Sequence, residues 1–242
     1  MIESLKNYLY RLKRNNQKTK ELIDQSKLLS RAVNQENVTF SEAFQAVNKY
    51  EAFQPSQIES EIEYLFEIVK TDQPKVICEI GSYKGGTLFL FSQAAPSDAL
   101  IISIDIQYPI ARKLSHKHLV KKGQKLVCIE GDTQDPKTIS RVTTVLNGRN
   151  IDFLFIDGDH SLFGVMNDYV RFSPLVKKSG VIAFHDINPD MFMKTGMKSA
   201  FYVGGVPIFW DFLTKSGAKF ETVVEDFEQD GFGIGIVHKS VE

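Results

Sequence analysis

Acidic residues recur at one kind of position in this chain, at or just after the end of a short apolar run. They are Glu79, Asp105, Asp132, Asp157 and Asp186. Because parallel strands of one sheet end at the same edge, where a doubly wound sheet has its ligand crevice, we expect these carboxylates to gather in one pocket. The alternative is that the acids are N-caps of the helices that follow. That alternative does not account for Glu79, which precedes its turn.

The first of these runs, Val76 to Ile80, leads directly into a glycine-bearing turn. Gly81 is predicted to form the tight turn, and Gly85 and Gly86 to let a ligand approach the backbone closely. The spacing differs from the G-x-G-x-x-G fingerprint of dinucleotide-binding domains. A carboxylate just before the turn favours a ligand with cationic and hydroxyl-bearing parts over a pyrophosphate.

Asp105 ends the second apolar run and can accept hydrogen bonds from both hydroxyls of a ribose. Asp132 follows the third run and is assigned either to the surroundings of an adenine ring or to a cap or turn.

Asp157 and Asp186 end the fourth and fifth runs. Neighbouring strands lie ~4.8 Å apart, so the two carboxylates can converge on a hard cation such as Mg²⁺. His185 stands beside them. The alternative is a pair of turn-forming aspartates that hold no metal.

His160 is the candidate general base, because an imidazole beside carboxylates is expected to titrate near working pH and to accept a hydroxyl proton. A purely structural histidine is the alternative. The other histidines, His116, His118 and His238, are assigned no role.

The elements that position these residues alternate between strand and helix. This pattern predicts an α/β fold with a doubly wound, mainly parallel seven-stranded sheet and an antiparallel last strand. The expected strands are 76–80, 100–106, 125–130, 151–156, 180–185, 220–224 and 232–237, and the expected helices between them include 109–122, 136–148, 164–172 and 207–217. Residues 188–205 are expected to form a surface excursion or lid.

The N-terminal part, residues 1–55, is predicted to be a helical arm, followed by a catalytic domain over 56–242. Thr39-x-x-Glu42 and Ser56-x-x-Glu59 are expected to be capping boxes. The helix over residues 1–35 is rich in Lys and Arg. It is expected to be a solvated face, with a docking arm or a homo-oligomer contact as the alternative.

Composition narrows the class of protein. The chain has 242 residues and a net charge of −1, which favours neither nucleic acid nor an anionic membrane as a partner. Cys78 and Cys128 fall inside predicted strands and are expected to be core residues in a reducing compartment. We therefore expect a cytoplasmic protein.

Four motifs together resemble a known family. They are Glu79-Ile-Gly81-Ser-Tyr-Lys-Gly85-Gly86-Thr, Ile156-Asp157-Gly-Asp159-His160-Ser161, Gly180-Val-Ile-Ala-Phe-His185-Asp186 and Gly205-Val-Pro207-Ile-Phe-Trp210. Over residues 55–240 the chain resembles class I S-adenosylmethionine-dependent methyltransferases. The nearest branch is the one that includes macrocin-type sugar O-methyltransferases and cephalosporin hydroxylase-like proteins.

This resemblance implies a role for each matching residue. The implied cofactor-binding residues are Glu79, Gly81, Ser82, Tyr83, Gly85, Asp105, Asp132 and Asp157. The implied metal ligands are Asp157, His185 and Asp186, and the implied catalytic residues are His160 and Asp157. The chain departs from the pattern at His185, where some relatives have a second acid; imidazole is a poorer Mg²⁺ ligand than carboxylate.

The expected function is transfer of a methyl group from S-adenosylmethionine to a hydroxyl of a small molecule, such as a sugar or a glycosylated metabolite. His160 would take the hydroxyl proton, assisted by Mg²⁺. The alternatives are a non-catalytic cofactor-binding or assembly protein and, less favoured, a nicotinamide-dependent oxidoreductase.

Overall fold

In the computed structural model, residues 2–33, 38–215 and 219–240 are described. Their helices are α1 (Ile2–Ala32), α2 (Phe40–Asn48), η1 (Glu51–Phe53), α3 (Glu59–Asp72), α4 (Gly86–Ala94), α5 (Ile110–His116), α6 (Pro136–Leu146), α7 (Leu162–Phe172), η2 (Ser173–Leu175), α8 (Met191–Thr195) and α9 (Val206–Thr214). Their strands are β1 (Val76–Ile80), β2 (Leu100–Asp105), β3 (Lys125–Glu130), β4 (Ile151–Ile156), β5 (Val176–His185), β6 (Lys219–Val223) and β7 (Ile234–His238).

The strands form one sheet in the order β3-β2-β1-β4-β5-β7-β6. Strands β1 to β5 pair in parallel, and β7 pairs antiparallel with both β5 and β6. The predicted mainly parallel sheet with an antiparallel last strand is confirmed. The strand order reverses between the neighbouring strands β1 and β4 at the centre of the sheet. Such a switch point is where doubly wound folds bind ligands.

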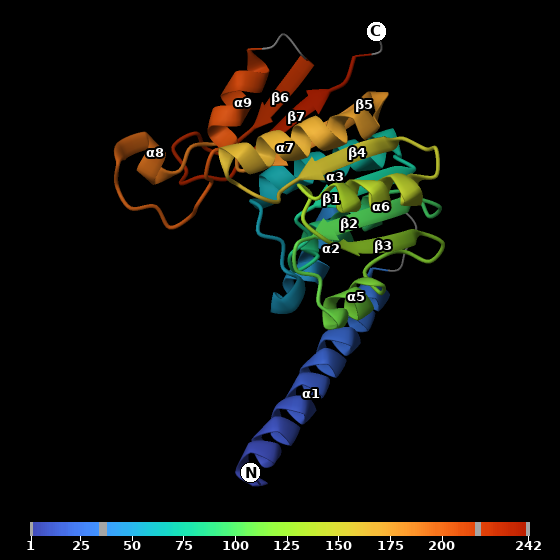
Figure 1. Ribbon diagram of the computed structural model, residues 1–242. Coiled ribbons are helices and arrows are strands. Elements are labelled where there is room, and N and C mark those ends of the chain that lie inside the picture. Colours follow the sequence, from blue (N-terminus) through green and yellow to red (C-terminus); the bar gives the residue numbers. More distant parts are fainter. Residues whose placement is uncertain (1, 34–37, 216–218, 241–242) are drawn as a thin grey trace.

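Helices cover both faces of this sheet (Figure 1). On one face, α2, α3 and α4 pack against side chains such as Ile77 and Phe153. On the other face, α6, α7 and α9 pack against side chains such as Cys78 and Leu154. Ile77 and Cys78 are consecutive on β1, and Phe153 and Leu154 are consecutive on β4, yet each member of a pair faces a different side of the sheet. Both strands are therefore buried on both sides, which agrees with their continuous apolar runs.

α1 extends away from the body of the molecule, and its C-terminal part lies beside α5 (Figure 1). Leu29 and Val33 are buried in the same hydrophobic cluster as α2, α3 and the sheet. The core therefore runs across position 55, where the chain was expected to divide into an arm and a domain. That division remains a prediction about the organisation of the protein.

Of the two predicted capping boxes, one is confirmed and one is wrong. Thr39 and Glu42 form the predicted capping box at the start of α2. The box predicted at Ser56 does not form, because α3 begins at Glu59 with Ile58 as its N-cap and with no side-chain cap.

The helix predicted over 109–122 is also shorter than expected. α5 ends at His116, where the buried imidazole is bonded between Tyr108 and the backbone of Lys84. Gly123 therefore ends a turn rather than a helix. Residue 217, the expected end of the helix after Pro207, lies outside the described residues.

Among the described residues, no helix has both the length and the apolar character needed to cross a membrane. Cys78 is buried and Cys128 half-buried, and both are free thiols.

Candidate functional site

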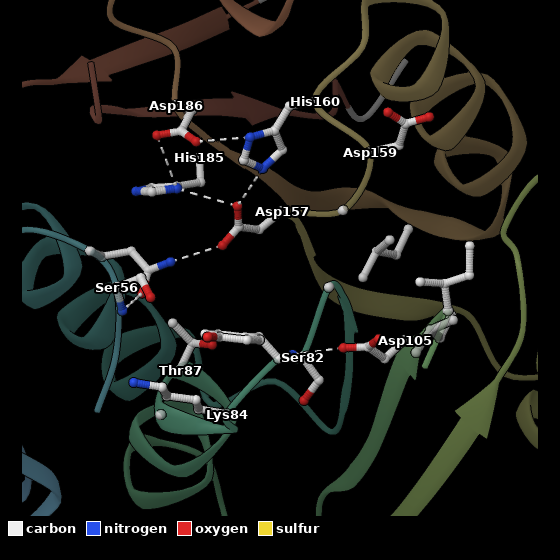
Figure 2. A pocket seen from close by; sticks show the side chains of 18 of the residues that line it. Ser56, Ser82, Lys84, Thr87, Asp105, Asp157, Asp159, His160, His185 and Asp186 are labelled. Atoms are coloured by element: carbon white, nitrogen blue, oxygen red, sulfur yellow. Dashed lines mark hydrogen bonds and ion pairs between the residues drawn. The ribbon is translucent and has the colours of Figure 1, made fainter. Parts of the chain in front are cut away.

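A pocket of about 640 Å³ opens at the carboxyl edge of the parallel strands. Its walls come from the glycine turn after β1, the residues that follow β2 to β5, and residues 54–57 ahead of α3. Phe201, Tyr202 and Phe232 supply an aromatic wall from the segments after β5 and before β7. Figure 2 shows Asp157, His160, His185 and Asp186 converging on one side of the pocket, whereas Asp105 and Asp159 lie apart from them.

The glycine turn is forced by contact with the strand beside it. Gly81 has φ +88°, and a Cβ there would lie 1.8 Å from the carbonyl oxygen of Asp157. At Gly85 a Cβ would lie 2.6 Å from His116 Nε2, and at Gly86 it would lie 2.4 Å from the nitrogen of Pro55. Both glycines line the pocket, and the close approach of a ligand to their backbone stays a prediction, but the Cβ side of both residues is occupied. Protein atoms fill that space.

Asp105 binds the turn as well as facing the pocket. Its Oδ2 accepts a hydrogen bond from the backbone nitrogen of Tyr83 at 2.8 Å, and its Oδ1 accepts one from Gln107 at 2.8 Å. Each carboxylate oxygen has a second lone pair. Both oxygens can therefore still accept from ligand hydroxyls.

Asp157, His160, His185 and Asp186 form a compact cluster, which we call the acid–histidine cluster. Asp157 Oδ1 lies 3.3 Å from His160 Nε2 and 3.2 Å from His185 Nδ1. Asp186 Oδ2 lies 3.2 Å from His160 Nδ1, and Asp186 Oδ1 lies 3.3 Å from His185 Nδ1. Asp186 adopts φ +62°, a strained backbone conformation of the kind concentrated at functional sites.

Charge in this cluster stabilises the imidazolium form of His160. Its two ring nitrogens face only acceptors: the two carboxylates and, at 3.1 Å, the carbonyl oxygen of Tyr202. Burial lowers the pKa of His160, but the bond and charge of Asp157 outweigh it and raise this pKa to about 9. The expectation that His160 titrates near working pH is therefore wrong for the chain without ligands.

The pKa values of the two aspartates, Asp157 and Asp186, are shifted in opposite directions. Burial acts to raise the pKa of Asp157, but the charge of His185 and the bond from His160 hold that pKa at about 2. The pKa of Asp186 is raised, chiefly because the group is buried. Asp157 is thus the permanent negative charge of the cluster.

One set of ligand atoms in the described residues is compact enough to hold a metal ion. Atoms of Asp157, His160 and Asp186 lie within 4.8 Å of one another. The sequence predicted the same two aspartates with His185. His185 touches both carboxylates through Nδ1, but its Nε2 is buried without a hydrogen-bond partner among the described residues.

The remaining predicted site residues divide between the pocket and the core. Gly81, Ser82, Tyr83, Gly85 and Asp132 line the pocket. Glu79 does not: its side chain is completely buried, and its Oε1 accepts a hydrogen bond from Thr87 Oγ1.

Sequence reasoning missed two residues that shape the site. Gln57 donates from Nε2 to Asp157 Oδ2 at 2.8 Å, across a separation of 100 residues that no local pattern reveals. His116, to which no role was assigned, is buried and contacts the glycine turn.

Comparison with known proteins agrees with this geometry. Residues 78–187 match the sequence profile of a family described as "Methyltransferase domain". A caffeoyl-CoA O-methyltransferase from Medicago sativa is 28% identical over 131 residues, which are 50% of this chain and 49% of that protein. An uncharacterized protein, R132, of Acanthamoeba polyphaga mimivirus is 34% identical over 115 residues, 45% of this chain and 49% of that protein.

Solved structures share the fold at lower identity. An O-methyltransferase from Bacillus cereus, crystallised with SAH, superposes with a TM-score of 0.56 at 13% identity and covers 91% of this chain and 100% of its own. The O-methyltransferase TomG from Streptomyces achromogenes, crystallised with SAM, gives 0.53 at 15% identity, with 92% and 98% covered.

The profile match marks residues 78–187 as similar to a methyltransferase domain, and the solved O-methyltransferases share the fold of the whole sheet. The chain spans about half the length of the curated relatives it matches. The predicted resemblance to class I methyltransferases is confirmed, whereas the narrower branch of sugar O-methyltransferases stays a prediction.

Proposed function

We propose that this protein is an S-adenosylmethionine-dependent O-methyltransferase acting on a hydroxyl of a small molecule. The observation that carries the proposal is a single pocket that joins the glycine turn and Asp105 to the acid–histidine cluster. The first part suits an adenosyl ligand with an amino-acid end, and the second suits the removal of a proton from an acceptor. The O-methyltransferases among the similar proteins support the same chemistry.

The residues present fit S-adenosylmethionine. Ser82 is buried in the turn and lines the pocket, and both carboxylate oxygens of Asp105 keep a lone pair for ligand hydroxyls. Ser82, Tyr83 and Gly85 would hold the amino-acid end, Asp105 the ribose and Asp132 the adenine surroundings. When bound, this cofactor supplies a methyl group that is already strongly electrophilic.

Glu79 would support this binding from beneath the pocket. Its carboxylate is joined to Thr87, a pocket-lining residue in the first turn of α4. In this proposal Glu79 stabilises the helix end and the turn that contact the cofactor.

His160 and Asp157 would carry the acceptor chemistry. The acceptor hydroxyl must lose a proton as it attacks, and a positioned base can accept that proton. His160 can do so only as the neutral ring, which the facing carboxylates disfavour. Any ligand that neutralises those carboxylates lowers the pKa of His160 again and frees a ring nitrogen.

A divalent cation fits the same carboxylates. Asp157 and Asp186 would hold it, with His185 as a nitrogen ligand beside them. Two carboxylate oxygens suit Mg²⁺, and an added imidazole shifts the preference toward Mn²⁺ and later transition metals. The cation would lower the pKa of the acceptor hydroxyl and orient it.

The acceptor we propose is a hydroxylated small molecule, for which a sugar or glycosylated metabolite remains the sequence-based expectation. Tyr202 and Phe232 stand beside the acid–histidine cluster and would stack on a ring of the acceptor, whether sugar or aromatic. The segment 188–205 would close over it.

The test begins with cofactor binding, measured by titration calorimetry with S-adenosylmethionine and, for comparison, NAD⁺. We expect binding of the first only, and a loss of at least about tenfold in affinity for Asp105→Ala, which removes a charged hydrogen-bond acceptor. Mass spectrometry of reactions with hydroxylated sugars and catechols should then detect a gain of one methyl group. Binding of NAD⁺ in place of S-adenosylmethionine would overturn the proposal.

The metal is tested separately. Dialysis against a chelator should reduce turnover by at least about tenfold, since a cation stabilises developing charge by several kcal/mol, and Mg²⁺ or Mn²⁺ should restore it. Turnover that is unchanged by the chelator would show that the acid–histidine cluster works without a cation.

A further inference from the structure

Two side chains of α5 bind the carbonyl groups of the glycine turn. Arg112 Nη1 donates to the carbonyl oxygen of Tyr83 at 2.5 Å. His116 Nε2 lies 3.1 Å from the carbonyl oxygen of Lys84. Arg112 and His116 are four residues apart, so they lie on one face of the helix. α5 therefore grips two consecutive peptide groups of the turn.

The chemistry of its neighbours fixes the tautomer of His116. A carbonyl oxygen can only accept, so the proton must be on Nε2. Nδ1 is then an acceptor, and the Tyr108 hydroxyl, 2.5 Å away, donates to it. Both side chains are almost fully buried, and burial lowers the pKa of His116 to about 4. The ring is therefore neutral, with one donor aimed at the turn.

The gripped peptide groups adopt a conformation that needs support. Tyr83 has φ +39° and Gly85 has φ +86°. A non-glycine residue in the left-handed region costs roughly 1–2 kcal/mol. Tyr83 is also held at its nitrogen by Asp105, and its ring lies 5.2 Å from the Arg112 guanidinium. The turn is thus fastened at both ends of Tyr83 and at Lys84.

We propose that Arg112 and His116 are positioning residues that hold the turn in its cofactor-binding conformation. The inference rests on the proposed function. Tyr83, Lys84 and Gly85 line the pocket, whereas Arg112 and His116 are outside its lining. The two α5 side chains therefore act on the cofactor through the turn and not by touching it.

The experiment measures affinity for S-adenosylhomocysteine by calorimetry, which needs no turnover. His116→Leu removes the donor and should weaken binding about tenfold, the upper end for one lost hydrogen bond. His116→Gln keeps an N–H donor and should restore affinity to within about threefold of the unsubstituted chain. Equal affinity of His116→Leu and the unsubstituted chain would overturn the inference.

A partly exposed residue gives a second variant with little risk to folding. Arg112→Met should weaken binding about three- to tenfold. Its matched control is Lys113→Met, which removes the same charge one residue along, where the ammonium pairs with Glu130 at 2.7 Å. Equal losses for Arg112→Met and Lys113→Met would reduce the effect to net charge and would contradict the inference.

A further control variant tests whether a loss of stability alone weakens ligand binding, and it is placed at the opposite end of β1 from the turn. Asp152 Oδ2 accepts from the nitrogens of Lys75 and Val76 at 2.8 and 2.7 Å, far along the strand from the turn. Asp152→Asn should lower the melting temperature and leave affinity unchanged. An unsubstituted chain that binds neither S-adenosylmethionine nor S-adenosylhomocysteine would instead overturn the proposed function itself.

Discussion

Asp157 connects the separate parts of the pocket through its two carboxylate oxygens. Oδ1 faces His160 and His185, while Oδ2 accepts from Gln57 in the loop ahead of α3. The backbone carbonyl of the same residue packs against Gly81. A change at this one position therefore disturbs both the glycine turn and the acid–histidine cluster, and single-residue tests are better aimed at its partners.

His160→Gln separates proton transfer from cofactor binding. It removes the basic nitrogen and keeps a polar side chain, so S-adenosylhomocysteine should bind within about threefold of its normal affinity. Turnover should fall by about 10²–10⁴, the range for a general base. The measurements are calorimetry and an initial-rate assay.

The control for that variant is His238→Gln, since His238 also pairs with a carboxylate, Glu221 at 2.5 Å, but on the terminal strand β7. Its turnover should be unchanged. A His160→Gln enzyme with normal turnover would disprove the assignment of the base.

The buried carboxyl group of Glu79 should make the free energy of unfolding depend on pH. Burial raises its pKa from 4.5 to about 7, so the folded chain holds the proton more tightly than the unfolded chain does. This contribution to stability is complete below pH 4.5 and is lost as the pH rises through about 7. Glu79→Gln does not titrate, so its free energy of unfolding should fall less than that of the unsubstituted chain between about pH 5 and pH 8.

Urea unfolding of the cofactor-free chain at several pH values measures this difference. If the two proteins lose stability in parallel over that range, Glu79 is charged in the folded state and its buried acid form is ruled out.

At the scale of elements, the glycine turn after β1 packs directly against the end of the neighbouring strand β4, with no room for a side chain at Gly81. Gly81→Ala would place a methyl group against the carbonyl oxygen of Asp157 and push β1 and β4 apart where the pocket begins. We expect loss of S-adenosylhomocysteine binding by at least about tenfold and destabilisation of about 2 kcal/mol or more, because overpacking adds to the cost of a positive φ.

Gly148→Ala is the matched control for that substitution. Gly148 has a similar φ, +81°, but no atom lies within 4 Å of its added Cβ. It should lose only about 1 kcal/mol, the cost of the left-handed backbone alone, with unchanged ligand affinity. Equal effects of the two substitutions on binding would show that the contact with Asp157 is unimportant.

Elements were predictable where local pattern and tertiary packing agree. Strands β2, β4 and β5 end at or directly before their predicted acids, and β1 and β3 end within two residues of theirs, because apolar runs leave little choice of strand position. The box at Thr39 forms because its partner Glu42 is free to bond back. The box at Ser56 does not form: the Ser56 nitrogen instead donates to the Gln57 side chain, which in turn reaches Asp157. That contact joins distant parts of the chain and has no local signature.

Contacts between distant parts of the chain also explain which features of the site the sequence did not predict. Strand topology alone brings Asp105, Asp132, Asp157 and Asp186 to one edge. Whether His160 or His185 completes the ligand set depends on side-chain direction at the sheet edge, which sequence spacing does not determine. The burial of Glu79 likewise follows from its packing beneath α4.

At the scale of the whole molecule, the N-terminal helix is part of the core and not only an appendage. Leu29 is fully buried among residues of α2, α3 and the sheet, while its neighbour Leu28 is 50% exposed. Leu29→Ala should lower the free energy of unfolding by about 2–5 kcal/mol, and Leu28→Ala by no more than about 0.5 kcal/mol. Denaturant titration followed by tryptophan fluorescence measures both, because Trp210 lies against the far side of the sheet. If Leu29→Ala left that transition unmoved, residues 1–55 would be an independent arm, and the expected boundary near Pro55 would be the correct description.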